Sequence, residues 1–245
     1  MTLHDTLTYA GEKGGANGDL IKNNPAFVRT RENMNEFNGC GQAVKAIRRG
    51  LQNLLPEQTD KNFTSRLMSI VKNVNLTDPI GLRGKRAISF SANRGMLFTL
   101  ILSTLQDIAD VLERQFANHV HPISRAEATL TLTDFSLRPV DIPLGATHYR
   151  VQNHISVISD YEYSEANRRY EPLSALNKMS AFTYSEYTPV KTKLTDDLVV
   201  SFPVGTVLTD DVTVIECVGI EFFQLLGADQ YCALKGSSMM VIDVF

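Results

Sequence analysis

The spacing of apolar residues changes near residue 117, and this change limits the folds open to the 245-residue chain. Before it, apolar side chains recur every three or four residues, as on one face of a helix. After it, they alternate with polar side chains, as in half-buried strands. We therefore predict an α+β fold, an N-terminal helical module followed by a C-terminal antiparallel β-sandwich.

The helical half contains three predicted helices. The first covers about 38–55, the second begins at Thr59 or Asp60, and the third covers 96–115, each with an apolar stripe at helical spacing. For the start of the third, "LFTLIL" (97–102), a buried strand is an equally good interpretation. A short strand over Ala87–Ser91 is predicted between the second helix and the third.

The second half contains seven or so short strands separated by Gly, Pro and Asp. The segment "SMMVIDVF" at the end is predicted to be a buried strand, reached through a hairpin that turns near Gly227–Gln230. Strict alternation places Met240, Ile242 and Val244 on one face and Met239, Val241, Asp243 and Phe245 on the other. Removing such a strand would unfold the module.

These patterns divide the chain into three predicted parts. Residues 1–28 are rich in Gly and Asn and are interpreted as a flexible glycine-rich arm, with ordering only against a partner as the alternative. Residues 29–116 form a basic helical module, and residues 117–245 form the β-sandwich. The two modules are able to share one core.

Charge is distributed unevenly over a net charge of -3. Residues 1–116 contain 15 Lys/Arg and 11 Asp/Glu, whereas residues 117–245 contain 9 and 16. Opposite charge on the two halves favours contact between modules or head-to-tail attraction between copies. A homo-oligomer or a complex with a protein partner is therefore expected.

Several classes of protein are disfavoured. The N-terminus lacks the basic and apolar regions of a signal peptide, and the apolar stretch at 96–105 is about half of a membrane span. We expect a cytoplasmic protein with no membrane partner. Three cysteines are too few and odd in number to suggest a disulfide framework. A bridge between Cys217 and Cys232 is not expected, because simple hairpin register places Cys232 opposite Leu225.

Basic residues in the helical half support a second hypothesis, association with nucleic acid. Such a protein would meet phosphates with clustered cations, and few aromatic residues lie nearby for base stacking. The alternative is a solvated helical face or one side of a contact between subunits. The candidate residues are Arg48, Arg49, Arg83, Lys85 and Arg86.

A metal-dependent enzyme is a third hypothesis. If the segment is extended, His119 and His121 share one side of it, as two ligands of one metal would, and the alternative is that they are surface or capping residues. The repeated "LTDD" at 194–197 and 208–211 is interpreted as turn chemistry, with cation binding as the alternative. No nucleotide-binding loop and no nucleophile motif is recognised, so no cofactor, small-molecule substrate or catalytic residue is predicted.

Tyrosines are concentrated in the β-sandwich half. A tyrosine ring offers apolar area with a polar tip and is favoured at interfaces, although cross-strand packing is an equally good explanation. The candidate interface residues are Tyr161, Tyr163, Tyr170, Tyr184 and Tyr187.

Two segments resemble a group of uncharacterised bacterial hypothetical proteins. One is "RTRENMNEFNGCGQAVKAIRRGL" (29–51), where an REN-x-x-EF motif leads into a basic helix. The other is the final "GIEFFQLLGADQYCALKGSSMMVIDVF", where a GIEF-x-Q strand leads into the last hairpin. The resemblance covers about a fifth of the chain and implies a bacterial, cytoplasmic origin, but no activity and no functional residues.

Together these features favour a non-enzymatic structural or interaction protein. We expect it to assemble with itself or to bind a protein partner through the β-sandwich and the N-terminal arm. Opposite charge on the two halves would make head-to-tail assembly possible.

Overall fold

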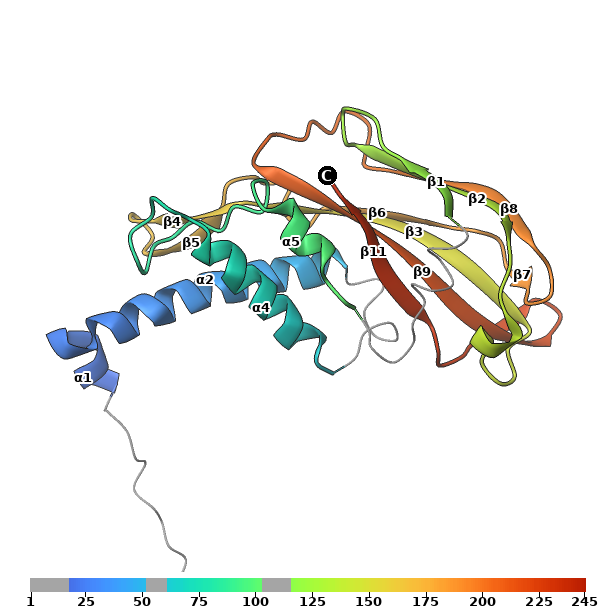
Figure 1. Ribbon diagram of the computed structural model, residues 1–245, viewed down its shortest axis with the longest axis horizontal. Helices are drawn as coiled ribbons and strands as arrows, with labels where there is room; N and C mark the ends of the chain where they lie inside the picture. Colours follow the sequence, from blue (N-terminus) through green and yellow to red (C-terminus); the bar gives the residue numbers. More distant parts are fainter. Residues whose placement is uncertain (1–17, 52–60, 103–115) are drawn as a thin grey trace, which may run out of the picture.

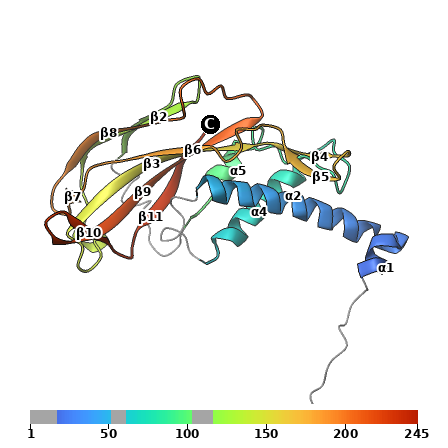
Figure 2. The ribbon, with the colours of Figure 1, turned by 180° about the vertical axis from the view of Figure 1, so that it is seen from behind.

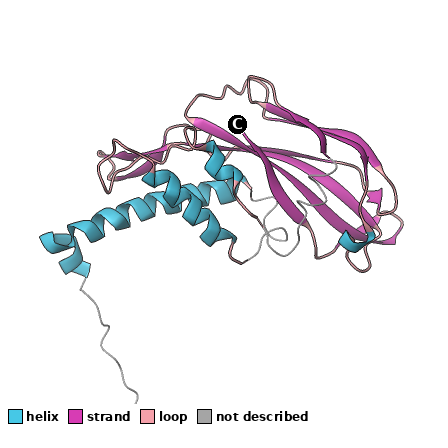
Figure 3. Cartoon of the chain, in the orientation of Figure 1, coloured by secondary structure: helices cyan, strands magenta, loops and turns pink. Residues whose placement is uncertain are grey.

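A computed structural model describes residues 18–51, 61–102 and 116–245, and residues 116–119 by backbone alone. Helices gather on one side of the molecule, and strands form the rest (Figure 3). The predicted α+β organisation is confirmed, with a helical N-terminal part before a largely antiparallel, sheet-rich region.

The helical part is built around one long helix. Short helices α1 (Gly18–Asn23) and η1 (Pro25–Phe27) lead into α2 (Val28–Gly50), which packs against α4 (Phe63–Leu76), and α5 (Arg94–Phe98) follows. Buried residues of α2 recur at three- and four-residue spacing from Glu36 to Gly50. None of residues 28–35 is buried, and this end of α2 projects past the sheets with α1 (Figure 1).

The sheet-rich part contains two antiparallel sheets. The smaller has the order β1 (Phe116–Val120), β2 (Glu127–Phe135), β8 (Leu194–Ser201). The larger has the order β10 (Gln230–Ala233), β9 (Val212–Gly227), β3 (His148–Ser159), β6 (Ser180–Tyr184), with β11 (Ser238–Val244) beside β9 and β7 (Thr188–Pro189) beside β3. A separate hairpin pairs β4 (Tyr161–Ser164) with β5 (Arg169–Pro172), and η2 (Pro139–Asp141) precedes β3.

Alternating apolar side chains hold the two sheets face to face. Leu130 and Leu132 of β2 pack with Val151 of β3 and with Val218 and Ile220 of β9 in one buried cluster. A second sandwich cluster lies farther along the same strands. The period of two in the sequence therefore becomes the interior of a sandwich, as expected for half-buried strands.

The other face of the larger sheet packs on the helices. One cluster joins Ile47 of α2 and Leu67 of α4 with Ile215 and Cys217 of β9 and Val241 of β11. The predicted helical and β modules consequently share a core. Figure 2 shows the same arrangement from behind, with α2 and α4 lying along one side of the larger sheet.

The C-terminal end of α2 makes a very close contact with the sheet. A Cβ atom on Gly50 would lie 2.0 Å from Ser156 Oγ, so any larger residue would force the buried Ser156 side chain to move. His154 Nε2 lies 3.0 Å from the Gly50 carbonyl oxygen. Burial lowers the pKa of His154 to about 4, so the ring is neutral, and its Nε2–H donates to that carbonyl.

The C-terminal strand is held in the sheet, as predicted. Phe245 and Val214 exchange two backbone hydrogen bonds of 3.0 and 2.7 Å. The pairing of β11 with β9 shifts between Val241 and Asp243, and this bulge breaks the strict alternation. Met239, Val241 and Val244 therefore face the helices, whereas Met240 and Ile242 face the sandwich.

The final hairpin turns between Gly227 and Gln230, as predicted, but its register differs by one residue. Cys232 pairs with Gln224, because the register shifts between Gln230 and Tyr231. Cys217 pairs with Val241 instead, and the three cysteines are free thiols.

Local predictions in the helical part need correction. The segment 87–91 is not a strand; only Ile88 pairs with Tyr161, and the chain turns directly afterwards. The predicted helix from 96 is wrong for 99–102, because Thr99 Oγ1 donates to the Met96 carbonyl and helps to end α5. Its remainder, 103–115, and the predicted start of the second helix at 59–60 lie outside the described residues.

Two further findings concern the predicted arm and membrane insertion. Residues 18–23 and 25–27 of the predicted arm are helical, and residues 1–17 lie outside the described part. Within the described residues, no helix is both long enough and apolar enough to cross a bilayer.

Candidate functional site

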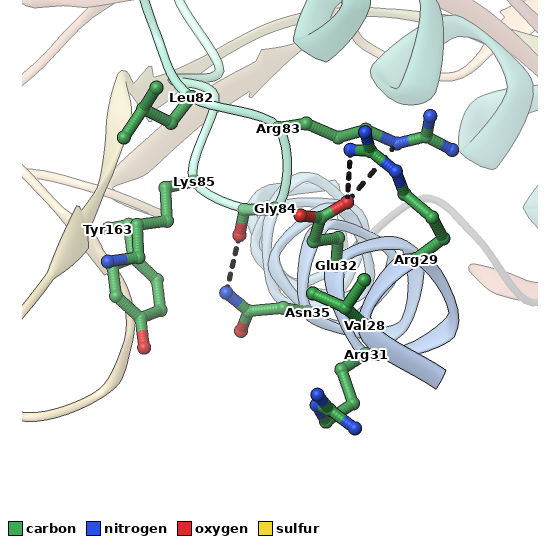
Figure 4. Close-up of a pocket in the computed structure, with 10 residues that line it drawn as sticks. All are labelled: Val28, Arg29, Arg31, Glu32, Asn35, Leu82, Arg83, Gly84, Lys85 and Tyr163. Atoms are coloured by element: carbon green, nitrogen blue, oxygen red, sulfur yellow. Dashed lines mark hydrogen bonds and ion pairs between the residues drawn. The ribbon is translucent and has the colours of Figure 1, made fainter. Parts of the chain in front are cut away.

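A pocket of about 690 Å³ lies where the projecting half of α2 meets the loop before Ile88 and strand β4. Helix α2 forms one wall, the loop forms the second, and Tyr163 of β4 closes one side (Figure 4). The lining residues are Val28, Arg29, Arg31, Glu32, Asn35, Leu82, Arg83, Gly84, Lys85 and Tyr163.

The REN-x-x-EF motif supplies much of this structure. Arg31 Nη1 donates to the carbonyl oxygens of Ile21 and Asn24, at 2.7 and 2.9 Å, and so ties α1 to α2. Glu32 lies 2.9 Å from Arg29 Nη1 and 3.6 Å from Arg83 Nε. One wall of the pocket is therefore held to the other through a carboxylate.

Glu36 of the same motif is buried beneath the loop. Its Oε2 accepts a hydrogen bond from Lys72 Nζ at 2.5 Å, and its Oε1 accepts one from Gly84 N at 2.8 Å. Arg86 Nη1 is 3.6 Å from the same carboxylate. Burial by itself would raise the pKa of Glu36, but the Lys72 and Gly84 hydrogen bonds and the nearby cations hold it below its ordinary value.

The loop itself has a fixed shape. Asp78 accepts hydrogen bonds from the backbone N–H groups of Ile80 and Gly81, at 2.9 Å, and of Ala87, at 2.7 Å. Gly84 has a φ of +91°, and a Cβ there would lie 3.0 Å from the backbone of Glu32. Both the turn and the close approach to α2 therefore require glycine.

The rim of the pocket combines cations with exposed apolar side chains. The side chains of Arg29, Arg83 and Lys85 are 66, 43 and 41% exposed. Leu82 is 76% exposed and Ile80, on the same loop, is 89% exposed. The rim therefore offers ion pairing and apolar area together, which suits contact with a macromolecular surface.

The five predicted nucleic-acid contacts do not form one patch. Arg83, Lys85 and Arg86 lie on the loop, paired with Glu32, Glu165 and Glu36 in that order. Arg48 and Arg49 lie in the last turn of α2, which is about 24 Å along the helix axis from Glu32.

The five predicted interface tyrosines occupy different environments. Tyr161 and Tyr170 are only 2 and 1% exposed, and Tyr170 packs on Gly39, where a Cβ would lie 2.4 Å from the ring. These two rings are part of the core. Tyr163 borders the pocket, and Tyr184 and Tyr187 belong to a second cluster on the larger sheet.

That second cluster surrounds Arg150, a residue that the sequence did not single out. The guanidinium carbon of Arg150 is 3.8 Å from the Tyr184 ring centroid, and Arg150 Nε is 2.6 Å from Glu221. Tyr187 stacks on Tyr231 with ring centroids 3.9 Å apart. Glu221 is the Glu of the GIEF-x-Q motif, so both motifs contribute a carboxylate that holds arginine.

Of the two predicted metal ligands, the structure describes the side chain of His121 alone. His121 stacks on Phe245 at 3.8 Å, and its Nε2 is 3.4 Å from Asp243 Oδ2. Of His119 only the backbone is described, in β1 opposite Leu130. Among the described residues, no three His, Cys, Asp or Glu side chains lie together as metal ligands, and this includes the LTDD segments.

Comparisons with known proteins add no identification. No protein-family model, no curated protein and no solved structure matches this chain.

Proposed function

We propose that this chain is an interaction protein, which binds another protein molecule through the pocket between α2 and the 80–86 loop. The supporting observation is the exposure of Ile80 and Leu82 on a loop that Asp78 and Glu36 hold in place, beside exposed cations of that loop and of α2. A rigid loop loses little conformational entropy when it binds, which favours recognition.

The charge arrangement favours a protein over a small anion. Arg29 and Arg83 share Glu32, and Lys85 pairs with Glu165, so an isolated anion would have to compete with these carboxylates. A protein surface adds apolar contact with Val28 and Leu82, and it can extend the ion-pair network at the rim.

A site-specific photo-crosslinker tests this proposal. Placed at Leu82 and irradiated in an extract of cells that produce the protein, it is expected to give discrete protein adducts. The matched control is Leu144, which is 102% exposed but does not line the pocket. Equal labelling at positions 82 and 144, or no adduct at 82, would contradict the proposal.

A further inference from the structure

The loop between β8 and β9 carries two strongly exposed apolar side chains three residues apart. Val204 is 107% exposed and Val207 is 76% exposed, so neither is covered by its own chain. We call residues 203–211 the prong. The prong lies at the top of the molecule in Figures 1 and 2, whereas α1 and α2 lie near the bottom.

The prong has a defined conformation. Thr206 N donates to the Pro203 carbonyl at 3.1 Å, and Gly205 between them has a φ of +86°, as in a β-turn that requires glycine. Arg125 then fixes the base of the loop, because its guanidinium donates to the carbonyl oxygens of Val212 at 2.9 Å and Thr209 at 2.7 Å. The two valines are therefore held outward before any partner binds.

The prong and the pocket are complementary in chemistry. The prong presents two apolar side chains followed by Asp210 and Asp211, of which Asp210 is exposed. The pocket presents apolar Val28 and Leu82 within a rim of arginine and lysine. Valine side chains fit the apolar wall, and the aspartates would face cations.

We propose that the prong of one copy occupies the pocket of the next, which makes the protein a head-to-tail assembly. This inference rests on the proposed binding role of the pocket and names its occupant. Because the two contacting surfaces differ, any open assembly keeps a free prong at one end and a free pocket at the other, so it grows as a filament unless a ring closes. A small contact with a charged rim is expected to be weak and to weaken further with salt.

The test is sedimentation velocity of the full chain over a series of concentrations, at low and high salt. Wild-type protein is expected to form larger species as concentration rises. Val204→Asp/Val207→Asp on the prong and Leu82→Asp at the pocket are each expected to weaken association at least about tenfold, or 1.4 kcal/mol. Leu144→Asp, at an equally exposed position away from both surfaces, should associate as the wild type does.

Mixing the two variants gives the sharpest result. The prong variant keeps its pocket and the pocket variant keeps its prong, so an equimolar mixture is expected to form dimers that grow no further. A contact between two prongs or between two pockets would give no such rescue. If Leu82→Asp fails to fold, the association of the prong variant, measured alone, still tests the inference.

Three results would overturn the inference: a monomer at all concentrations, association that survives the prong substitutions, or a mixture without dimers. None of them removes the proposed function. Crosslinking at Leu82 to a different protein would retain the binding role and replace the occupant, whereas absence of any adduct would remove both.

Discussion

Two fully buried glutamates, one in each half of the molecule, have pKa values shifted in opposite directions. Glu36 lies on α2 beneath the 80–86 loop. It is contacted by Lys72 and Arg86, and its pKa is lowered. The pKa of Glu216, inside the sheet-rich half, is raised to about 8: burial is the main cause, a hydrogen bond from Asn153 offsets part of the shift, and the nearby Asp243 adds to it.

The comparison shows that burial alone does not determine what a carboxylate contributes. In the helical half, cations and a backbone N–H favour the charged form, so Glu36 joins three segments and stabilises the fold. In the sheet-rich half, the alternation of apolar side chains supplies the stability, and Glu216 is neutral near pH 7. The two halves are thus held together by different kinds of interaction.

The largest expected effect comes from removing Met239–Phe245. Three of the buried side chains lost, Met239, Val241 and Ile242, contribute about 1.5–3 kcal/mol each. Their combined loss is comparable to the whole stability of a typical domain. The truncated chain should lack a cooperative thermal transition by circular dichroism. A normal transition would show that β11 is dispensable and that both sheets and helices stand without it.

Glu36→Gln is expected to destabilise the protein by about 2–3 kcal/mol, because Lys72 and Arg86 lose a charged partner. The matched control is Glu32→Gln, at a more exposed position, which should cost less. Since the pKa of Glu36 is lowered in the folded state, its contribution is present above its ordinary pKa of 4.5 and disappears as the pH falls through the folded value. Urea denaturation at pH 7 and at pH 3 measures both differences; equal losses at the two pH values would contradict the assignment.

Glu216→Gln should have the opposite sign. With a folded pKa of about 8 against an ordinary 4.5, the folded state binds the extra proton between these values, so stability falls as the pH rises through that range. The glutamine variant avoids this cost and should gain about 1–2 kcal/mol at pH 8 and almost nothing at pH 4. Thermal unfolding at the two pH values measures the gain, and destabilisation at pH 8 would refute the comparison.

Arg150→Lys should have the smallest effect, about 1 kcal/mol, because lysine keeps the charge opposite Glu221 but loses the planar contact with Tyr184. A double-mutant cycle with Tyr184→Leu isolates the ring contact. Additive losses would indicate that the arginine and the ring do not interact. The cluster would then be stabilised by the same apolar packing as the sandwich around it.

Much of the architecture follows from sequence periodicity. The stripe that includes Cys40, Val44 and Ile47 predicts the packed part of α2, and the alternation at 127–135 predicts β2. Both signals work because a regular element repeats the same environment every turn or every second residue. The bulge at Val241–Asp243 and the register of Cys232 could not be predicted, since an inserted residue leaves no mark in a composition pattern.

The pocket was harder to predict because its residues lie far apart in the sequence. Asn35 donates to the Gly84 carbonyl across 49 positions, and Glu165 meets Lys85 across 80. One signal was present: Glu32 and Glu36 are four residues apart and therefore share a face of α2. The density of basic residues on the loop allows a nucleic-acid surface, a solvated face or a contact between subunits, and the sequence does not reveal that these cations already have carboxylate partners.

The long pairing between β9 and β3 has a consequence for how the chain folds. All twelve residues of β3 find partners in β9, with Val151 opposite Ile220, and the end of α2 reaches His154 across 104 positions. Contacts between distant segments form slowly, because the chain loses the entropy of closing a large loop before these contacts can stabilise it. Newly unfolded chains should therefore regain helix early and their central sheet late, and in that interval an apolar strand is open to aggregation.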